Sequence, residues 1–73
     1  MQFTLTINCD GEAFEDFPAQ EVANILARLM DTADGYSHRN LRTADAGDRT
    51  EENPFVLMDR NGARVGTAYF TEV

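Results

Sequence analysis

The sequence predicts an α+β domain in the order β-α-β-β, in which a three-stranded antiparallel sheet carries one helix packed on one face. Three observations predict it: strict alternation in residues 2–8, a helical apolar stripe in residues 18–33, and two apolar segments around a turn in residues 54–72. A chain of 73 residues has room for one core, so we expect residues 1–73 to form a single domain.

The first strand is predicted from side chains that alternate along residues 2–8. Phe3, Leu5 and Ile7 fall on one face, and the threonines and the asparagine between them fall on the other. The cluster Asn8-Cys9-Asp10-Gly11 that follows is rich in turn-forming residues, so we expect the strand to end there.

The helix predicted over residues 18–33 has Asp16 as its N-cap, Pro18 in its first turn and Gly35 just beyond its end. Its apolar stripe consists of Val22, Ile25, Leu26, Leu29, Met30 and Ala33, and its outward face of Glu21, Asn24, Arg28 and Asp31. We interpret the stripe as core that covers the sheet, rather than as a docking groove.

The third and fourth segments form a predicted hairpin around a type I turn, with Asp59 at its first position and Gly62 left-handed in a bulge. This turn places Leu57 opposite Val65 and Phe55 opposite Thr67. Both faces of the hairpin are then apolar, the second carrying Val56, Met58, Gly66, Ala68 and Phe70. One helix cannot cover both faces, so we expect part of the hairpin to be a contact surface and the chain to dimerise at micromolar concentration.

Residues 36–53 form a long polar loop with no sustained period. A loop of this length is usually functional or disordered. The sequence leaves open whether the segment is simply disordered or becomes ordered when it binds a partner. The spacing of Asp48 and Glu51 resembles a capping box and predicts at most one helical turn there.

Residues suited to catalysis or metal binding are scarce. Cys9 is the only cysteine and His38 the only histidine, so an intrachain disulfide or a Cys/His zinc site lacks partners. We interpret Cys9 as a small buried thiol at a strand end and His38 as a loop residue. Asp59-x-Asn61-Gly62 is too short for a calcium loop and suits a turn better. We therefore expect neither an enzyme nor a cofactor or metal.

The net charge of −7 is unevenly distributed, since residues 1–34 hold seven acids against one base, Arg28. Nucleic acid and anionic membrane both repel such a surface, so a protein with a basic surface is the expected partner. A lone thiol suits a reducing compartment, and residues 1–7 lack a basic segment or a long apolar run, so a cytoplasmic location is expected.

The acidic cluster of residues 10–21 is the candidate partner-binding site. Its five acids are Asp10, Glu12, Glu15, Asp16 and Glu21, and Phe14 and Phe17 lie between them. One interpretation is a solvated loop whose phenylalanines enter the core. The other is an acidic, aromatic surface that engages arginines on a partner.

Several segments together resemble a group of small proteins encoded by phages and prophages of GC-rich bacteria. They are Phe3-Thr-Leu-Thr-Ile followed by Cys9-Asp10, then Ala13-Phe14, Glu21-Val-Ala-x-Ile-Leu and Asn61-Gly62-x-x-Val65-Gly66-Thr-Ala-x-Phe70. The resemblance covers the two ends of the chain and not the middle loop, and it carries over no catalytic residue.

In class and charge the chain also resembles phage inhibitors of host defence, including anti-CRISPR and anti-restriction proteins. That resemblance implies an inhibitor that blocks a basic nucleic-acid-binding site of a host defence complex in the bacterial cytoplasm. The alternative is a small homo-oligomeric phage accessory or regulatory protein, joined through the apolar face of the hairpin.

Overall fold

A computed structural model describes residues 1–30, 41 and 45–72 of the chain, and within them it has one α-helix and one three-stranded sheet. The strands are β1 (Gln2–Ile7), β2 (Phe55–Met58) and β3 (Arg64–Thr71), and the helix is α1 (Pro18–Met30). Short 3-10 helices form at Glu12–Phe14 (η1) and Ala46–Asp48 (η3). The predicted α+β fold is confirmed.

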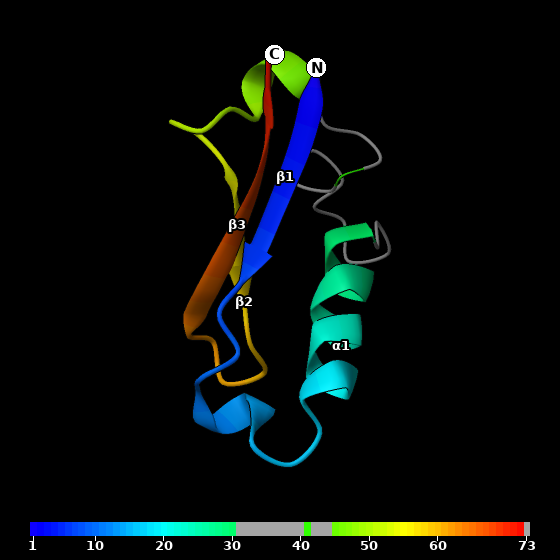
Figure 1. Ribbon diagram of the computed structural model, residues 1–73, viewed down its shortest axis with the longest axis vertical. Coiled ribbons are helices and arrows are strands. Elements are labelled where there is room, and N and C mark those ends of the chain that lie inside the picture. The colour runs from blue at the N-terminus through cyan, green and yellow to red at the C-terminus, as the bar shows by residue number, and fades with distance from the viewer. Residues whose placement is uncertain (31–40, 42–44, 73) are drawn as a thin grey trace.

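The sheet has the order β1-β3-β2, and both pairs are antiparallel. Figure 1 views it nearly edge-on, with α1 lying along one face and nothing covering the opposite face among the described elements. β1 pairs with β3 in one unbroken register, which places Phe3 opposite Phe70 and Leu5 opposite Ala68. Leu5 and Ile7 pack against the core, so the odd-numbered β1 residues lie on the α1 side, as the alternation predicts.

The register between β2 and β3 differs from the predicted one by one residue. Leu57 lies opposite Gly66, and Phe55 lies opposite Ala68. Because a shift of one residue moves a whole strand to the other face, the predicted assignment of hairpin faces is wrong. Phe55 and Leu57 are buried together with Ala68, while the exposed Val56 belongs to the open face.

A second bulge in the hairpin causes this shift. The turn itself forms as predicted: the N–H of Gly62 donates to the Asp59 carbonyl at 3.0 Å, and Gly62 has a φ of 82°. The register then shifts again between Leu57 and Met58, because Met58 pairs with Arg64 and leaves Val65 as the extra residue on β3.

The core lies between the sheet and α1 and extends beneath η1. Its buried apolar residues are Ala13, Phe14, Ile25, Leu29, Phe55, Leu57 and Ala68. Ile25 and Leu29 confirm the predicted helical stripe, although Met30 is exposed and Ala33 lies outside the described residues.

The predicted N-cap is wrong by one residue. The N–H of Glu21 donates to the carbonyl of Phe17 at 3.1 Å, which makes Phe17 the capping position and leaves Asp16 outside the helix. Pro18 then occupies the first helical position, where its missing N–H does no harm. The predicted C-terminal Gly35 lies outside the described residues.

Part of the predicted polar loop is structured. Asp45 caps η3 by accepting a 3.0 Å hydrogen bond from the N–H of Gly47, so the helical turn begins before Asp48 rather than at it. The carbonyl of Arg49 accepts the N–H of Phe70 at 2.8 Å, and its guanidinium lies 4.8 Å from the centre of the Phe55 ring. The Arg49 contacts hold this part of the loop against the sheet, although the sequence showed no sustained period there.

Candidate functional site

The acidic cluster of residues 10–21 is shaped by η1, which connects β1 to the loop before α1. The N–H of Phe14 donates to the Gly11 carbonyl at 3.0 Å, and that of Glu15 donates to the Glu12 carbonyl at 3.2 Å. Phe14 and Ala13 are buried, so this short helix is anchored in the core by its apolar side. Its acidic side chains therefore project from a fixed backbone.

Four of the five predicted acids are exposed, namely Asp10, Glu12, Glu15 and Asp16. Among the described residues, the ion pair within 4.0 Å joins Arg28 and Glu21, and none of these four acids has a basic nitrogen within that distance. Figure 1 places this segment at one end of the molecule, beyond the C-terminal end of β1 and the N-terminal end of α1. Uncompensated carboxylates grouped at one end create a local negative potential.

Phe17 adds a large apolar group to this acidic segment. Its side chain is 74% exposed, whereas Phe14 is buried at 2%. Phe14 therefore enters the core as the first interpretation expects, whereas Phe17 does not. Phe17 lies between Asp16 and Pro18, and because proline and the start of the helix constrain its backbone, the ring is presented from a fixed point.

Glu21 is not part of this exposed surface, because its side chain is only 4% exposed. Its Oε2 accepts the backbone N–H of Arg60 at 2.8 Å. The same oxygen lies 3.9 Å from the guanidinium of Arg28, which itself donates to the carbonyl of Met58 at 2.8 Å. Glu21 and Arg28 thus bind the hairpin turn to α1, and the accessible surface reduces to four acids with Phe17.

Among the residues considered for metal binding or nucleophilic chemistry, Asp59 has a structural role in the turn. Asp59 is buried, and its Oδ1 accepts the N–H groups of Asn61 at 2.9 Å and Ala63 at 3.0 Å, as the turn interpretation requires. Cys9 is exposed, so the expectation of a buried thiol is wrong, although it does follow a strand end. His38 lies outside the described residues. Within residues 1–30, 41 and 45–72, no group of three or more His, Cys, Asp or Glu side chains could hold a metal ion.

Two features of the site were missed in the sequence, and one of them left a signal. Glu21 precedes Ile25 by four residues and Leu29 by eight, so it lies in line with the buried stripe rather than opposite it. That spacing could have indicated a buried carboxylate. The partner of Glu21 is a backbone group of the hairpin, and nothing in the side-chain pattern identifies it.

Comparison with protein-family models, with curated proteins and with solved structures finds no match to this chain. In the part of the chain that the structure describes, no helix is long and apolar enough to cross a membrane.

Proposed function

We propose that this protein is a non-enzymatic binding protein that uses the acidic surface of Asp10, Glu12, Glu15, Asp16 and Phe17 to occupy a basic site on another protein. In its specific form, the proposal is an inhibitor that blocks a nucleic-acid-binding site of a host defence complex, as anti-CRISPR proteins do. The resemblance of class and charge supports that specific form, and the geometry supports the general one.

The observation that carries the proposal is the combination of four exposed carboxylates without a basic neighbour in the described residues and one exposed aromatic ring in the same segment. Protein interfaces place aromatic anchors at their centres and let charges steer the encounter. A site that normally holds phosphates presents arginines and lysines, for which carboxylates are the complementary charge.

The test compares three proteins as affinity baits in a bacterial lysate: wild type, a cluster variant and a matched control. The cluster variant is Glu12→Gln, Glu15→Gln, Asp16→Asn. The control is Glu51→Gln, Glu52→Gln, Glu72→Gln, which removes three exposed acids from the segment after η3 and from the residue after β3. That segment and the C-terminus lie at the end of the molecule opposite η1 (Figure 1). Each captured protein is then assayed for nucleic-acid binding with and without the added bait.

The proposal requires a captured protein whose nucleic-acid binding falls when wild type or the control is added, and is restored when the cluster variant replaces them. Capture that is equal for all three baits would place the binding site elsewhere. A target that binds through the acidic surface but does not bind nucleic acid would support the proposed binding surface. It would contradict the proposal that the protein inhibits nucleic-acid binding.

One observation favours the second function, a homo-oligomeric accessory or regulatory protein. Among the described residues, the outer edge of β1 pairs with no other strand, so it is available to a strand of a second copy.

A further inference from the structure

The outer edge of β1 offers an unpaired row of backbone groups. The N–H of Asn8 donates to the carbonyl of Val65 at 2.7 Å, which continues the register in which Ile7 lies opposite Gly66. In an antiparallel pair, successive residues direct their backbone groups alternately toward the partner strand and away from it. The N–H and C=O groups of Phe3, Leu5 and Ile7 therefore point away from β3.

These outward groups have almost no partners within the described part of the chain. No backbone hydrogen bond reaches them, and the only side-chain contact is that of the Cys9 thiol with the Ile7 carbonyl at 3.8 Å. Figure 1 is seen from the β1 side of the sheet, and no described element passes in front of that strand.

β1 also lacks the features by which proteins usually protect a free edge. Charged side chains, proline, bulges and short length discourage pairing with another chain. The six residues Gln2–Ile7 contain no charge and no proline, and their register with β3 is unbroken. The opposite edge, β2, has four residues, follows Pro54 and meets a bulge at Leu57 and Met58. The two edges therefore differ, and β1 is the one open to addition.

We propose that β1 pairs with β1 of a second copy of this chain, antiparallel and with Leu5 on the two-fold axis. Leu5 then lies opposite the partner's Leu5, and Phe3 lies opposite the partner's Ile7. Because all three residues direct their backbone groups outward, each N–H and C=O group of this set gains a partner. The product is a six-stranded sheet with both copies of α1 on the same face.

Self-complementarity and charge favour a second copy over another occupant. With this register, apolar core-side residues meet apolar core-side residues, and Thr4 meets the partner's Thr6 on the open face. A net charge of −7 opposes association, but β1 is uncharged. Antiparallel pairing also separates the two acidic segments. In this register, Ile7 of one copy and Ile7 of the other lie four residues apart along the strands, about 14 Å, and each acidic segment begins beyond its own Ile7. That separation exceeds the Debye length of about 10 Å at 0.1 M salt.

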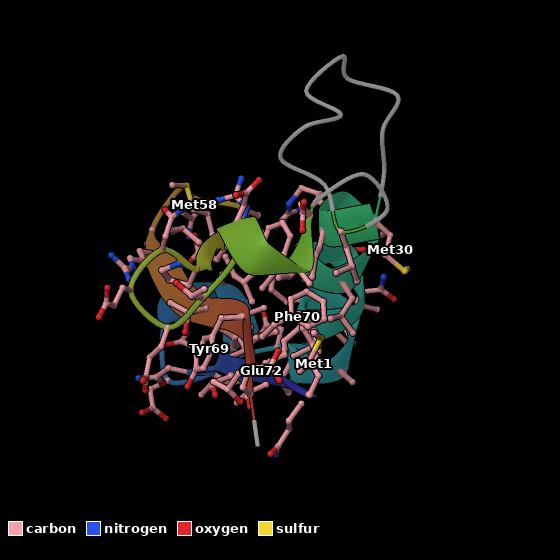
Figure 2. The ribbon with its side chains drawn as sticks, turned by 90° about the horizontal axis from the view of Figure 1, so that it is seen from above. Met1, Met30, Met58, Tyr69, Phe70 and Glu72 are labelled. Atoms are coloured by element: carbon pink, nitrogen blue, oxygen red, sulfur yellow. The ribbon has the colours of Figure 1, made fainter. Side chains whose placement is uncertain are left out.

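The edge-paired dimer differs from one joined through the open sheet face. The open face carries Val56 at 45% and Met58 at 50% exposure, and Figure 2 shows Met58 and Tyr69 on the side away from α1. A dimer on that face would bury these residues and leave the β1 edge free. The two arrangements can thus be distinguished by introducing charged side chains on one surface or the other and measuring which substitution prevents association.

The first test places lysines on each candidate interface and measures sedimentation equilibrium from low to high micromolar concentration. Thr4→Lys with Thr6→Lys sets like charges directly opposite one another across the proposed pair, and should raise the dimer dissociation constant at least about tenfold. The matched variant, Val56→Lys with Met58→Lys, should leave it unchanged. The reverse result would overturn edge pairing in favour of the open face, and a wild-type protein that stays monomeric throughout would reject the proposal.

The second test fixes the register by cross-linking. Two proteins are made in a Cys9→Ser background, one with Thr4→Cys and the other with Thr6→Cys. Residues 4 and 6 of different copies would lie directly opposite, with Cα atoms about 4.5 Å apart, within the reach of a disulfide. Identical positions would lie on a diagonal, about 7–8 Å apart.

Mild oxidation should therefore give a disulfide-linked dimer when the two proteins are mixed, and little when either is oxidised alone. Cross-linking of the Thr4→Cys protein with itself would overturn the register with Leu5 on the axis. Absence of any cross-link, combined with an unchanged dimer, would overturn β1 as the interface. If wild type is monomeric alone and the outward amide of Leu5 becomes protected from hydrogen exchange only with a foreign protein, the occupant is a strand of that partner and not a second copy.

Discussion

The carboxylate of Glu21 in α1 accepts a 2.8 Å hydrogen bond from the backbone N–H of Arg60 in the β2–β3 turn, 39 residues further along the chain. The acceptor is buried, and its charge is opposed by the Arg28 guanidinium at 3.9 Å. A hydrogen bond to a charged group contributes more than a neutral one, and its loss would remove the acceptor from a partly buried contact. This contact therefore binds the hairpin to the helix in a core of limited size.

Replacement of Glu21 by alanine should lower the free energy of unfolding by about 1.5–3 kcal/mol. For a domain of this size, each kcal/mol corresponds to a fall of roughly 4–8 °C in Tm. Glu21→Gln should cost less, because its amide oxygen can still accept from Arg60 although the charge is lost. Urea unfolding followed by circular dichroism measures both, and the exposed Glu15→Gln serves as the control, expected within about 0.5 kcal/mol of wild type. Equal stability of Glu21→Ala and the control would contradict the role assigned to Glu21.

Gly66 should be intolerant of any side chain. A Cβ atom built there would lie 1.9 Å from the carbonyl oxygen of Thr6, a backbone atom of the neighbouring strand that has little freedom to move. Gly66→Ala should therefore lower the free energy of unfolding by about 3 kcal/mol or more, at the upper end of single substitutions.

Gly11→Ala provides the matched control for Gly66. Its φ is −76°, and no atom lies within 4 Å of a Cβ built there, so alanine should be neutral or stabilise by about 0.4–1 kcal/mol. Thermal unfolding of the two variants side by side checks the pair. A folded Gly66→Ala protein as stable as Gly11→Ala would mean that β1 and β3 can separate at this point.

The part of the fold that depends on local patterns could be predicted from the sequence. Alternation identified β1, the apolar stripe identified α1, and Asp59 with Gly62 identified the turn. A single glycine within a strand pattern, such as Gly66, is typical of a bulge or a close backbone approach, and Gly66 does lie close to the backbone of β1. Each of these is decided by neighbours in sequence or by a single steric requirement.

The errors arose where distant segments decide the structure. The bulge at Val65 depends on how β3 fits between two strands, so the turn alone could not set the β2 register. Arg49 accepts a hydrogen bond from Phe70, a contact across the fold that orders residues 45–53. The sequence predicted which segment forms the candidate site. It could not predict the burial of Glu21 and the exposure of Phe17, because both depend on how α1 and the hairpin pack together.

Phe17→Ala should separate binding from stability. The ring is 74% exposed, so its removal should change the free energy of unfolding by less than about 0.5 kcal/mol. If Phe17 anchors the interface, affinity for the captured target should fall by about 2 kcal/mol, as for aromatic hot spots elsewhere. Phe14→Ala should instead lower stability by about 3–5 kcal/mol, because that ring is buried. Isothermal titration measures the affinity and urea unfolding measures the stability. An unchanged affinity of Phe17→Ala would show that the acidic side chains, and not the ring of Phe17, form the binding site.

The cluster variant Glu12→Gln, Glu15→Gln, Asp16→Asn should weaken binding mainly by slowing association. Each exposed charge pair contributes about 0.2–1 kcal/mol, so a single substitution does little, while the three together should cost about 1–3 kcal/mol if their effects add. Charges outside a desolvated centre act chiefly on the rate of encounter, and dissociation should change less.

Affinity of the wild type should also fall with salt, since the Debye length shrinks from about 10 Å at 0.1 M to about 3 Å at 1 M. Surface plasmon resonance against the captured target at several salt concentrations measures rates and salt slope together, with circular dichroism as the control for folding. The variant should have a shallower salt slope than wild type, because fewer charges remain to be screened. Equal association rates and equal slopes would move the binding surface away from η1 and toward the segment of residues 45–53.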